Sequence, residues 1–246
     1  MSLTTQLRAQ LQCHALPPSS ETWLQTLISS RNPPPPLPSL VMTAKTRLLA
    51  SDLTTSGLLD STRISMLCFP SAITTPTVKE THLASDVYAQ VVDIENLSRS
   101  RSEEIAELEA IERGEQTRGR EVIRLPVNNE GGEELAGTRP PEATARPQAE
   151  PAPSTKNATH RLVLQDSKGQ KVYGLELVRI PEIVIGTLSI GAKILLKKGT
   201  VVARGTILLD PKKVQVLGGK IEAWHKAWLD GRLVRLKEVI AARNQE

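Results

Sequence analysis

Short stretches in which every second side chain is apolar follow one another between residues 161 and 219, and they constrain the fold most strongly. From Val201 to Leu209, small or apolar side chains alternate with Arg204 and Thr206, which is the period of a β-strand. The apolar face of this stretch is predicted to hold Val201, Ala203, Gly205, Ile207 and Leu209. The stretch is therefore predicted to be a half-buried strand.

The same alternation predicts further strands in this region. The side chains expected to face the core are Tyr173, Leu175, Leu177, Val214 and Val216, with Glu176 on the opposite face. Residues 166–169 supply a hairpin turn that ends in glycine, and only a brief connection separates the later strands. Several short strands at this spacing favour a small closed antiparallel barrel over a βαβ unit. We therefore predict an OB-type barrel.

The β-branched stretch Val87–Ile94 predicts an opening strand for this barrel, far ahead of the next strand. Residues 95–159 would then form an insertion between the first two strands, and a loop of that length is usually functional or disordered. Ser100 and Glu103 fit a capping box, which predicts a helix ending near Gly114. Residues 128–159 contain five prolines and little apolar material, so this part is expected to be disordered.

Helical segments are predicted at both ends of the chain, which gives an α+β class. Residues 1–85 form a helical region with three amphipathic stretches and a stiff spacer at Pro33–Pro36, which could also serve as an SH3-type ligand. Residues 86–219 form the barrel with its insertion. Residues 220–246 carry a C-terminal helix with Trp224 and Trp228 on one face. We expect that helix to complete the N-terminal bundle by packing on it.

The charge of the chain is unevenly distributed. Residues 161–246 carry 16 basic and 8 acidic side chains, whereas residues 86–160 carry 9 basic and 15 acidic ones. The two cysteines, Cys13 and Cys68, have neither disulfide-framework nor metal-site spacing, so buried thiols in a reducing compartment are expected. No apolar run approaches the roughly 18 residues that span a bilayer, and a soluble chain without membrane contact is expected.

Catalytic motifs are not apparent, and no enzyme activity is predicted. The four histidines lie far apart, and the sequence contains no nucleophile elbow, P-loop or dinucleotide-binding glycine motif. Neither a cofactor nor a metal ion is therefore expected. The carboxylates between Glu103 and Glu115 are interpreted as a solvated helix face, although a fold can bring distant residues together.

Two binding functions remain from the residues alone. An OB-type barrel often binds single strands, and the lysines available for phosphates are Lys168, Lys171, Lys193, Lys197, Lys198, Lys212 and Lys213. Tyr173 is the only aromatic residue between Arg161 and Lys220, so such binding would be weak and salt-dependent, and the lysines could instead be solubilising surface. The second function is a scaffold that presents its insertion to a partner, with residues 118–126 as the anchor.

The most distinctive segments of the chain are Lys193–Gly199, Arg204–Pro211, Val214–Gly219, the strand and turn Val91–Arg101 and, more loosely, Trp23–Leu24. These segments resemble the RecQ-mediated genome instability protein 1 family. The resemblance covers most of the chain from Thr22 to Leu236 and is to the short form typical of fungal members, because larger members carry a second, C-terminal OB domain.

The resemblance implies a non-enzymatic subunit of a complex between a RecQ helicase and a type IA topoisomerase III, which dissolves double Holliday junctions. The insertion would lie at the topoisomerase gate and favour decatenation, and the protein would be nuclear. The partner contacts carried over are Arg118, Arg120, Val122, Ile123, Arg124 and Leu125, with Lys212 and Lys213 as secondary contacts. The alternative is an OB-fold protein that binds single-stranded or junction DNA through its basic surface.

Overall fold

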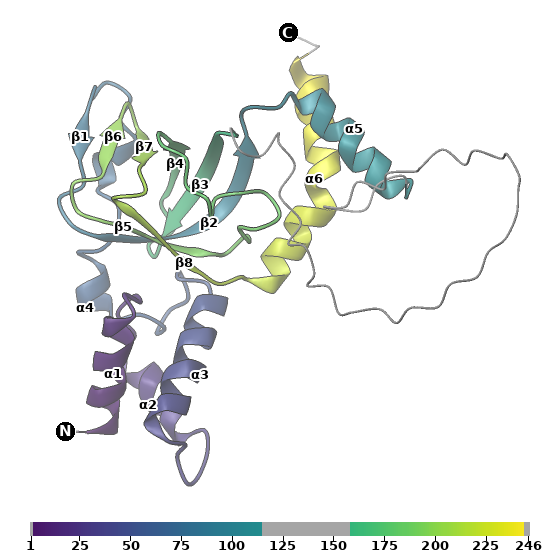
Figure 1. The fold of residues 1–246 in the computed structure, drawn as a ribbon. Coiled ribbons are helices and arrows are strands. Elements are labelled where there is room, and N and C mark those ends of the chain that lie inside the picture. Colours follow the sequence, from purple (N-terminus) through teal and green to yellow (C-terminus); the bar gives the residue numbers. More distant parts are fainter. Residues whose placement is uncertain (1, 115–157, 244–246) are drawn as a thin grey trace, which may run out of the picture.

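A computed structural model describes residues 2–114 and 158–243 of the chain. Figure 1 shows a group of N-terminal helices below a curled sheet, and a pair of helices, α5 (Arg101–Glu112) and α6 (Glu222–Arg243), to its right. The α+β class predicted from the sequence is confirmed.

The N-terminal helices pack around one another through leucine-rich faces. Ser2 and Ser20 cap the first two helices with their side chains. The shared core includes Leu7, Leu24 and Leu48, each fully buried. The helices are α1 (Leu3–Cys13), α2 (Glu21–Ser29), α3 (Leu37–Ala50) and α4 (Ser61–Ile64), followed by a 3₁₀ turn at Ser71–Thr74.

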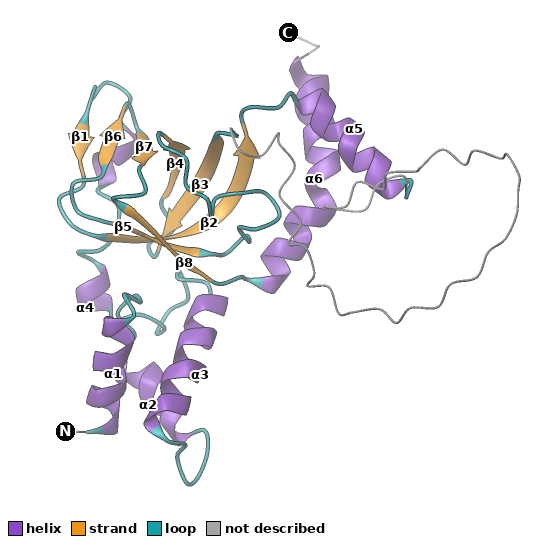
Figure 2. Cartoon of the chain, viewed as in Figure 1, coloured by secondary structure: helices purple, strands orange, loops and turns teal. Residues whose placement is uncertain are grey.

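An eight-stranded sheet follows, curled into a half-barrel (Figure 2). Its spatial order is β1-β6-β7-β4-β3-β2-β5-β8, so β1 and β8 are its ends, and β4 pairs with β7 in parallel. The predicted antiparallel pairing holds for the other six strand pairs, whereas the predicted closure is corrected, because β1 and β8 are not paired with each other. The strands are β1 (Thr81–His82), β2 (Val87–Asn96), β3 (His160–Asp166), β4 (Lys171–Glu176), β5 (Lys193–Leu196), β6 (Val201–Ala203), β7 (Thr206–Leu209) and β8 (Val214–Gly218).

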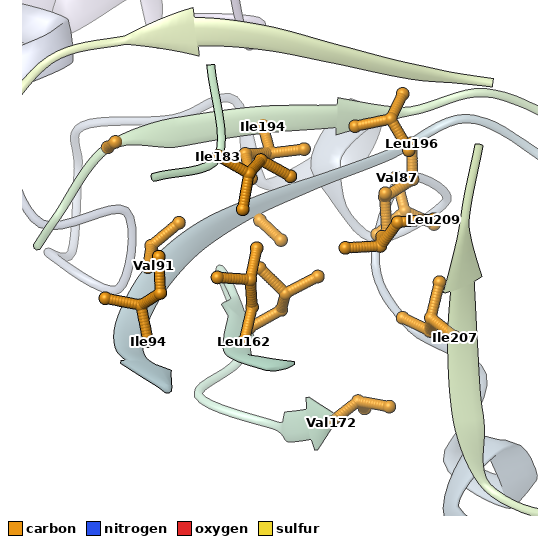
Figure 3. Close-up of a cluster of buried hydrophobic side chains, with 14 of the residues drawn as sticks. Val87, Val91, Ile94, Leu162, Val172, Ile183, Ile194, Leu196, Ile207 and Leu209 are labelled. Atoms are coloured by element: carbon orange, nitrogen blue, oxygen red, sulfur yellow. The ribbon is translucent and has the colours of Figure 1, made fainter. Parts of the chain in front are cut away.

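The core of the sheet lies inside its curl. Figure 3 shows aliphatic side chains from six segments pointing toward one another. The labelled residues are Val87, Val91, Ile94, Leu162, Val172, Ile183, Ile194, Leu196, Ile207 and Leu209. All of them are buried, so this cluster holds the barrel together without a large aromatic component.

Two strands, β4 and β6, bury the opposite face from the one predicted. In β4 the buried residues are Val172, Gly174 and Glu176, whereas Tyr173 is 51% exposed and Leu177, just beyond the strand, is 63% exposed. Glu176 is buried because it has polar partners inside, and Gly174 because Leu164 and Leu209 pack directly over its Cα.

The predicted strand from Val201 to Leu209 is in fact a hairpin. Arg204 and Gly205 both have positive φ, at 49° and 80°, which is the geometry of a tight two-residue turn. Val202 is paired with Ile207 across the hairpin, and paired residues point to the same side of a sheet. Val202 is therefore buried in place of its neighbours Val201 and Ala203, while Ile207 and Leu209 are buried as predicted.

The C-terminal helix α6 (Glu222–Arg243) packs on the barrel and on α5 (Arg101–Glu112), which corrects its expected place on the N-terminal bundle. Trp228 belongs to the barrel core, and its Nε1 donates a hydrogen bond of 2.6 Å to Asp93 Oδ1 in β2. The N-terminal helices already bury their apolar stripes against one another, so they leave little surface for α6 to cover.

Candidate interaction surface

The insertion leaves the barrel and returns to it through one ladder. Asn96 in β2 pairs with His160 in β3, and the Leu97 amide donates to the Thr159 carbonyl at 2.8 Å. The insertion was predicted to begin at residue 95, but Glu95 and Asn96 are strand residues. Leu97 and Thr159 therefore mark the mouth of the insertion.

A buried polar pair fixes the sheet directly beneath this mouth. The His160 Nδ1 and Glu176 Oε2 atoms lie 2.7 Å apart, and both side chains are 2% exposed. Burial alone would raise the pKa of Glu176, but hydrogen bonds from His160, from the Ile180 amide and from Arg179 outweigh it, so the pKa lies below the usual 4.5. Closed off from solvent, the pair joins β3 to β4 and has no access to a substrate.

The first turn of α5 is anchored to the mouth. Ser100 and Glu103 form the predicted capping box, in which each side chain bonds the other's backbone amide. Glu95 of β2 accepts hydrogen bonds from Arg101 at 3.1 Å and from Arg161 of β3. The insertion therefore starts as a helix whose direction is set by the barrel.

The remainder of α5 packs against α6. The Glu104 carboxylate forms an ion pair with Arg232, and each of these two residues is less than 10% exposed. The Arg232 guanidinium also lies 4.8 Å over the Trp228 ring, and its burial lowers its pKa to about 10. The sequence had been interpreted as giving a solvated carboxylate face here, and Glu104 corrects that interpretation.

Four of the predicted lysines come together at the junction of two loops. The Lys197 amide donates to the Lys213 carbonyl at 2.8 Å, and Lys213 Nζ donates to the Lys198 carbonyl at 3.2 Å. Lys212 lies two residues after Asp210, whose carboxylate accepts a hydrogen bond from the Lys212 amide at 2.8 Å. Lys197, Lys198, Lys212 and Lys213 are all exposed, and we call them the lysine cluster.

The remaining predicted lysines do not join this cluster. Lys168 lies in the turn between β3 and β4, where its Nζ contacts the Ser65 carbonyl at 3.5 Å, and Lys171 is the first residue of β4. Lys193 is fully buried, so it cannot contact nucleic acid, and its assignment to that role is wrong. Its Nζ donates to the Gly191 carbonyl at 2.6 Å, and burial lowers its pKa to about 8 despite the nearby charge of Asp52.

The partner-binding segment predicted from the sequence lies outside the described residues. This applies to Arg118, Arg120, Val122, Ile123, Arg124 and Leu125 alike. What the structure adds is the described framework on either side of that segment, namely α5 and the mouth.

Neither a metal site nor a membrane-spanning helix is found in the described part of the chain. Within residues 2–114 and 158–243, no three His, Cys, Asp or Glu side chains gather as a metal site. No helix in those same ranges is long and apolar enough to cross a membrane. Both cysteines are free, and Cys68 is buried as expected whereas Cys13 is exposed, contrary to expectation.

Comparison with known proteins assigns both folded parts of the chain. Residues 69–232 match the model described as "RMI1, N-terminal OB-fold domain", and residues 15–56 match "RMI1, N-terminal helical domain". A protein of Schizosaccharomyces pombe named RecQ-mediated genome instability protein 1 is 32% identical over 160 residues, which are 64% of this chain and 66% of that relative. The predicted OB-type fold and the resemblance are confirmed, and the chain belongs to the RecQ-mediated genome instability protein 1 (RMI1) family.

Proposed function

We propose that the chain is a non-catalytic accessory subunit for genome stability that binds a topoisomerase III and a RecQ-family helicase in the nucleus. Its insertion would act at the topoisomerase gate and so promote decatenation and the dissolution of double Holliday junctions. Membership of the RMI1 family supports this proposal, and the name of the fission yeast relative refers to RecQ.

The observation that carries the proposal is the way the insertion is presented. It leaves the barrel at Leu97, runs into α5, and α5 is fastened to α6 before the chain reaches residues 115–157. A segment that starts from a fixed helix has fewer orientations to lose on binding than one tethered by a flexible loop, which lowers the entropy cost of association. The contacts proposed for Arg118 to Leu125 begin six residues after Glu112, the last residue of this helix.

A non-catalytic role is supported by the positions of three buried ionisable groups with perturbed pKa values. Glu176, Lys193 and Arg232 are each enclosed by polar or aromatic partners within the fold. Groups enclosed in this way are not accessible to a substrate, whereas catalytic groups need a cleft that admits one.

Two deletions test the proposal. One removes residues 98–158 and joins Leu97 to Thr159, whose backbones are already hydrogen-bonded. The other removes residues 115–157 and keeps α5 on α6. We expect the intact chain to bind topoisomerase III in calorimetry and to stimulate decatenation, and both deletions to abolish that stimulation. A deleted chain that stimulates as well as the intact one would overturn the role of the insertion.

A second function, binding of single-stranded or junction DNA, is favoured by the lysine cluster. Four exposed ammonium groups from two loops form a compact positive surface of the kind that attracts phosphates. Fluorescence anisotropy with a single-stranded oligonucleotide at several salt concentrations tests it. Replacing the four lysines with alanine should flatten the dependence of affinity on salt, with a loss of slope of about 0.7 for each phosphate contact. Equal slopes for both chains would exclude the cluster.

A further inference from the structure

A groove of about 340 Å³ lies where the N-terminal helices meet the barrel. Figure 1 shows α1 and α4 below the sheet, and the groove opens between these helices and the start of β2. Ligand sites are often found at such boundaries between domains. We call it the junction groove, and its lining includes Leu16, Pro18, Arg63, Met66, Leu67 and Tyr88. None of these residues belongs to the insertion or to its mouth.

The lining of the junction groove is mostly apolar, and its backbone is held in place. Met66 is 76% exposed, and exposed methionines, which are flexible and polarizable, are typical of surfaces that bind peptides. The Tyr88 amide donates a hydrogen bond to the Leu67 carbonyl at 3.2 Å, and the Ser85 hydroxyl donates one to the Met66 carbonyl at 2.8 Å. The groove is therefore formed before a ligand arrives, which lowers the entropy cost of binding.

Arg63 places a cation at the junction groove. The neighbouring carboxylate of Asp60 caps α4, where it accepts hydrogen bonds from the Thr62 hydroxyl and from the Thr62 and Arg63 amides. Among the described residues, the Arg63 guanidinium is therefore left without a hydrogen-bonded carboxylate. Arginine is the residue type best suited to hold a carboxylate, because it can donate two parallel hydrogen bonds to it.

Further cations continue from the groove along the surface. Lys168 Nζ lies 3.5 Å from the Ser65 carbonyl, beside the groove. On the other side, Asp86, two residues before Tyr88, accepts a hydrogen bond from the Lys198 amide at 2.8 Å. The lysine cluster therefore adjoins the junction groove. A surface that is apolar in its hollow and cationic on either side complements a ligand that is apolar at its centre and acidic at its ends.

These features favour a short acidic peptide as the occupant. A volume of about 340 Å³ is at the small end of the range for ligand pockets, so the groove accepts a few side chains rather than a folded surface. Single-stranded nucleic acid would find one aromatic ring in the lining, that of Tyr88, whereas binding by base stacking relies on several. A second copy of the chain in a two-fold contact would bring cationic surfaces together, which costs free energy.

We infer that the junction groove is a docking site for a short peptide of a partner chain, in which a large apolar side chain is flanked by aspartate or glutamate. The apolar side chain would pack among Leu16, Met66 and Tyr88, and a neighbouring carboxylate would pair with Arg63. Further carboxylates would meet the lysine cluster. This inference goes beyond the proposed function, because it requires neither the insertion nor topoisomerase III.

The test first selects the ligand and then locates it. Random peptides displayed on phage are selected on the full chain, and the enriched peptides are labelled for fluorescence anisotropy. We expect them to combine acidic residues with leucine or an aromatic residue. Arg63→Glu with Met66→Ser should weaken their binding at least about tenfold. Arg47→Glu with Met42→Ser, at exposed positions of α3 outside the groove, is the matched control and should leave binding unchanged.

An exchange of charge provides a second reading. A selected peptide whose acidic residues are replaced by lysine should bind the Arg63→Glu chain more tightly than the wild type, because repulsion at this position becomes attraction. Melting temperatures close to that of the wild type identify variants that are folded. Met66→Ser alone, at an exposed position, takes the place of a double variant that does not fold.

Several outcomes would overturn the inference. They are a selection that enriches no acidic peptides, equal affinity of the folded groove variants and the wild type for the selected peptides, and a loss of affinity for a single-stranded oligonucleotide in place of the peptide. Binding of topoisomerase III should be the same in the groove variants and the wild type. Its loss together with peptide binding would show that the groove is not a separate site, which also overturns the inference.

Discussion

Arg232 in the C-terminal helix and Glu104 in the first helix of the insertion form a buried ion pair. Trp228, one turn before Arg232, donates a hydrogen bond to Asp93 in β2. A chain of contacts thus runs from the barrel through α6 to α5. Three segments that are far apart in sequence are thus fixed in one arrangement, which sets the direction of α5.

Glu104→Ala should release α5 from α6. The substitution leaves the Arg232 guanidinium buried without its carboxylate partner, which typically costs about 3–5 kcal/mol. Because α5 detaches more easily than the barrel unfolds, the loss should appear as faster amide hydrogen exchange across residues 101–112. Glu109→Ala is the matched control, since its carboxylate pairs with Lys237 at 2.7 Å on a more exposed part of the same helix. Unchanged exchange in α5 of the Glu104 variant would contradict the bracing role.

Glu176→Gln should make the barrel less sensitive to acid. The folded pKa of Glu176 lies below its unfolded value, so its contribution to stability is present above about pH 4.5 and is lost as the pH falls through the folded pKa. Urea unfolding between pH 7 and pH 2 measures this. The variant should be less stable than the wild type at pH 7, and the difference should shrink as the pH falls below 4.5. A constant difference would show that this carboxylate does not titrate as inferred.

Lys193→Met should change the alkaline limb of the stability curve. The pKa of Lys193 is lowered from 10.5 to about 8, so the unfolded chain binds the proton more tightly and the charged lysine costs roughly 3 kcal/mol at neutral pH. Wild-type stability should gain from this group as the pH rises from 8 toward 10.5. The methionine variant should lack that gain and be at least as stable at pH 7. Parallel curves for the two proteins between pH 8 and pH 10 would argue against a charged, buried lysine.

Ile207→Ala and Leu208→Ala form a neighbouring pair that tests the facing of β7. Ile207 is fully buried in the barrel core, so its truncation should lower the free energy of unfolding by about 2–5 kcal/mol. Leu208 points outward and is only partly buried, so its truncation should cost much less. Thermal or urea unfolding of the two variants measures the difference. Equal losses of unfolding free energy in the two variants would contradict the inward orientation of Ile207 in β7.

Local chemistry made much of the fold predictable. The capping box at Ser100, the glycine of the β3–β4 turn and the leucine spacing of the first helices all act within a few residues. Each was therefore visible in the sequence. The order of helical region, barrel and C-terminal helix followed from these signals.

The alternation of apolar side chains predicted the β4 strand correctly but predicted the wrong face of it to be buried. Period-two patterning says that neighbours point to opposite sides, and it does not say which side is inside. In β4 the outer face carries the larger apolar side chains. The inner face carries Glu176, whose buried carboxylate is hydrogen-bonded to a histidine 16 residues away. A pairing of that separation cannot be read from local sequence, and neither can the bond between Trp228 and Asp93, which are 135 residues apart.

The burial of Lys193 could not be predicted from the local sequence either. Lys193 opens a strand in which all four residues are buried, and this continuous burial is a signal that alternation does not capture. Lys197, a few residues later, is exposed because the chain turns there toward β6. One short segment thus contains both a buried and an exposed lysine.

The ladder that closes at Leu97 and Thr159 also bears on how this family can vary. Once the two ends of a loop are held together, each doubling of its length costs only about 0.6 kcal/mol in chain entropy. Residues can therefore be gained or lost beyond α5 with little effect on the folding of the barrel. The length of that segment can therefore change while the domain that carries it stays the same.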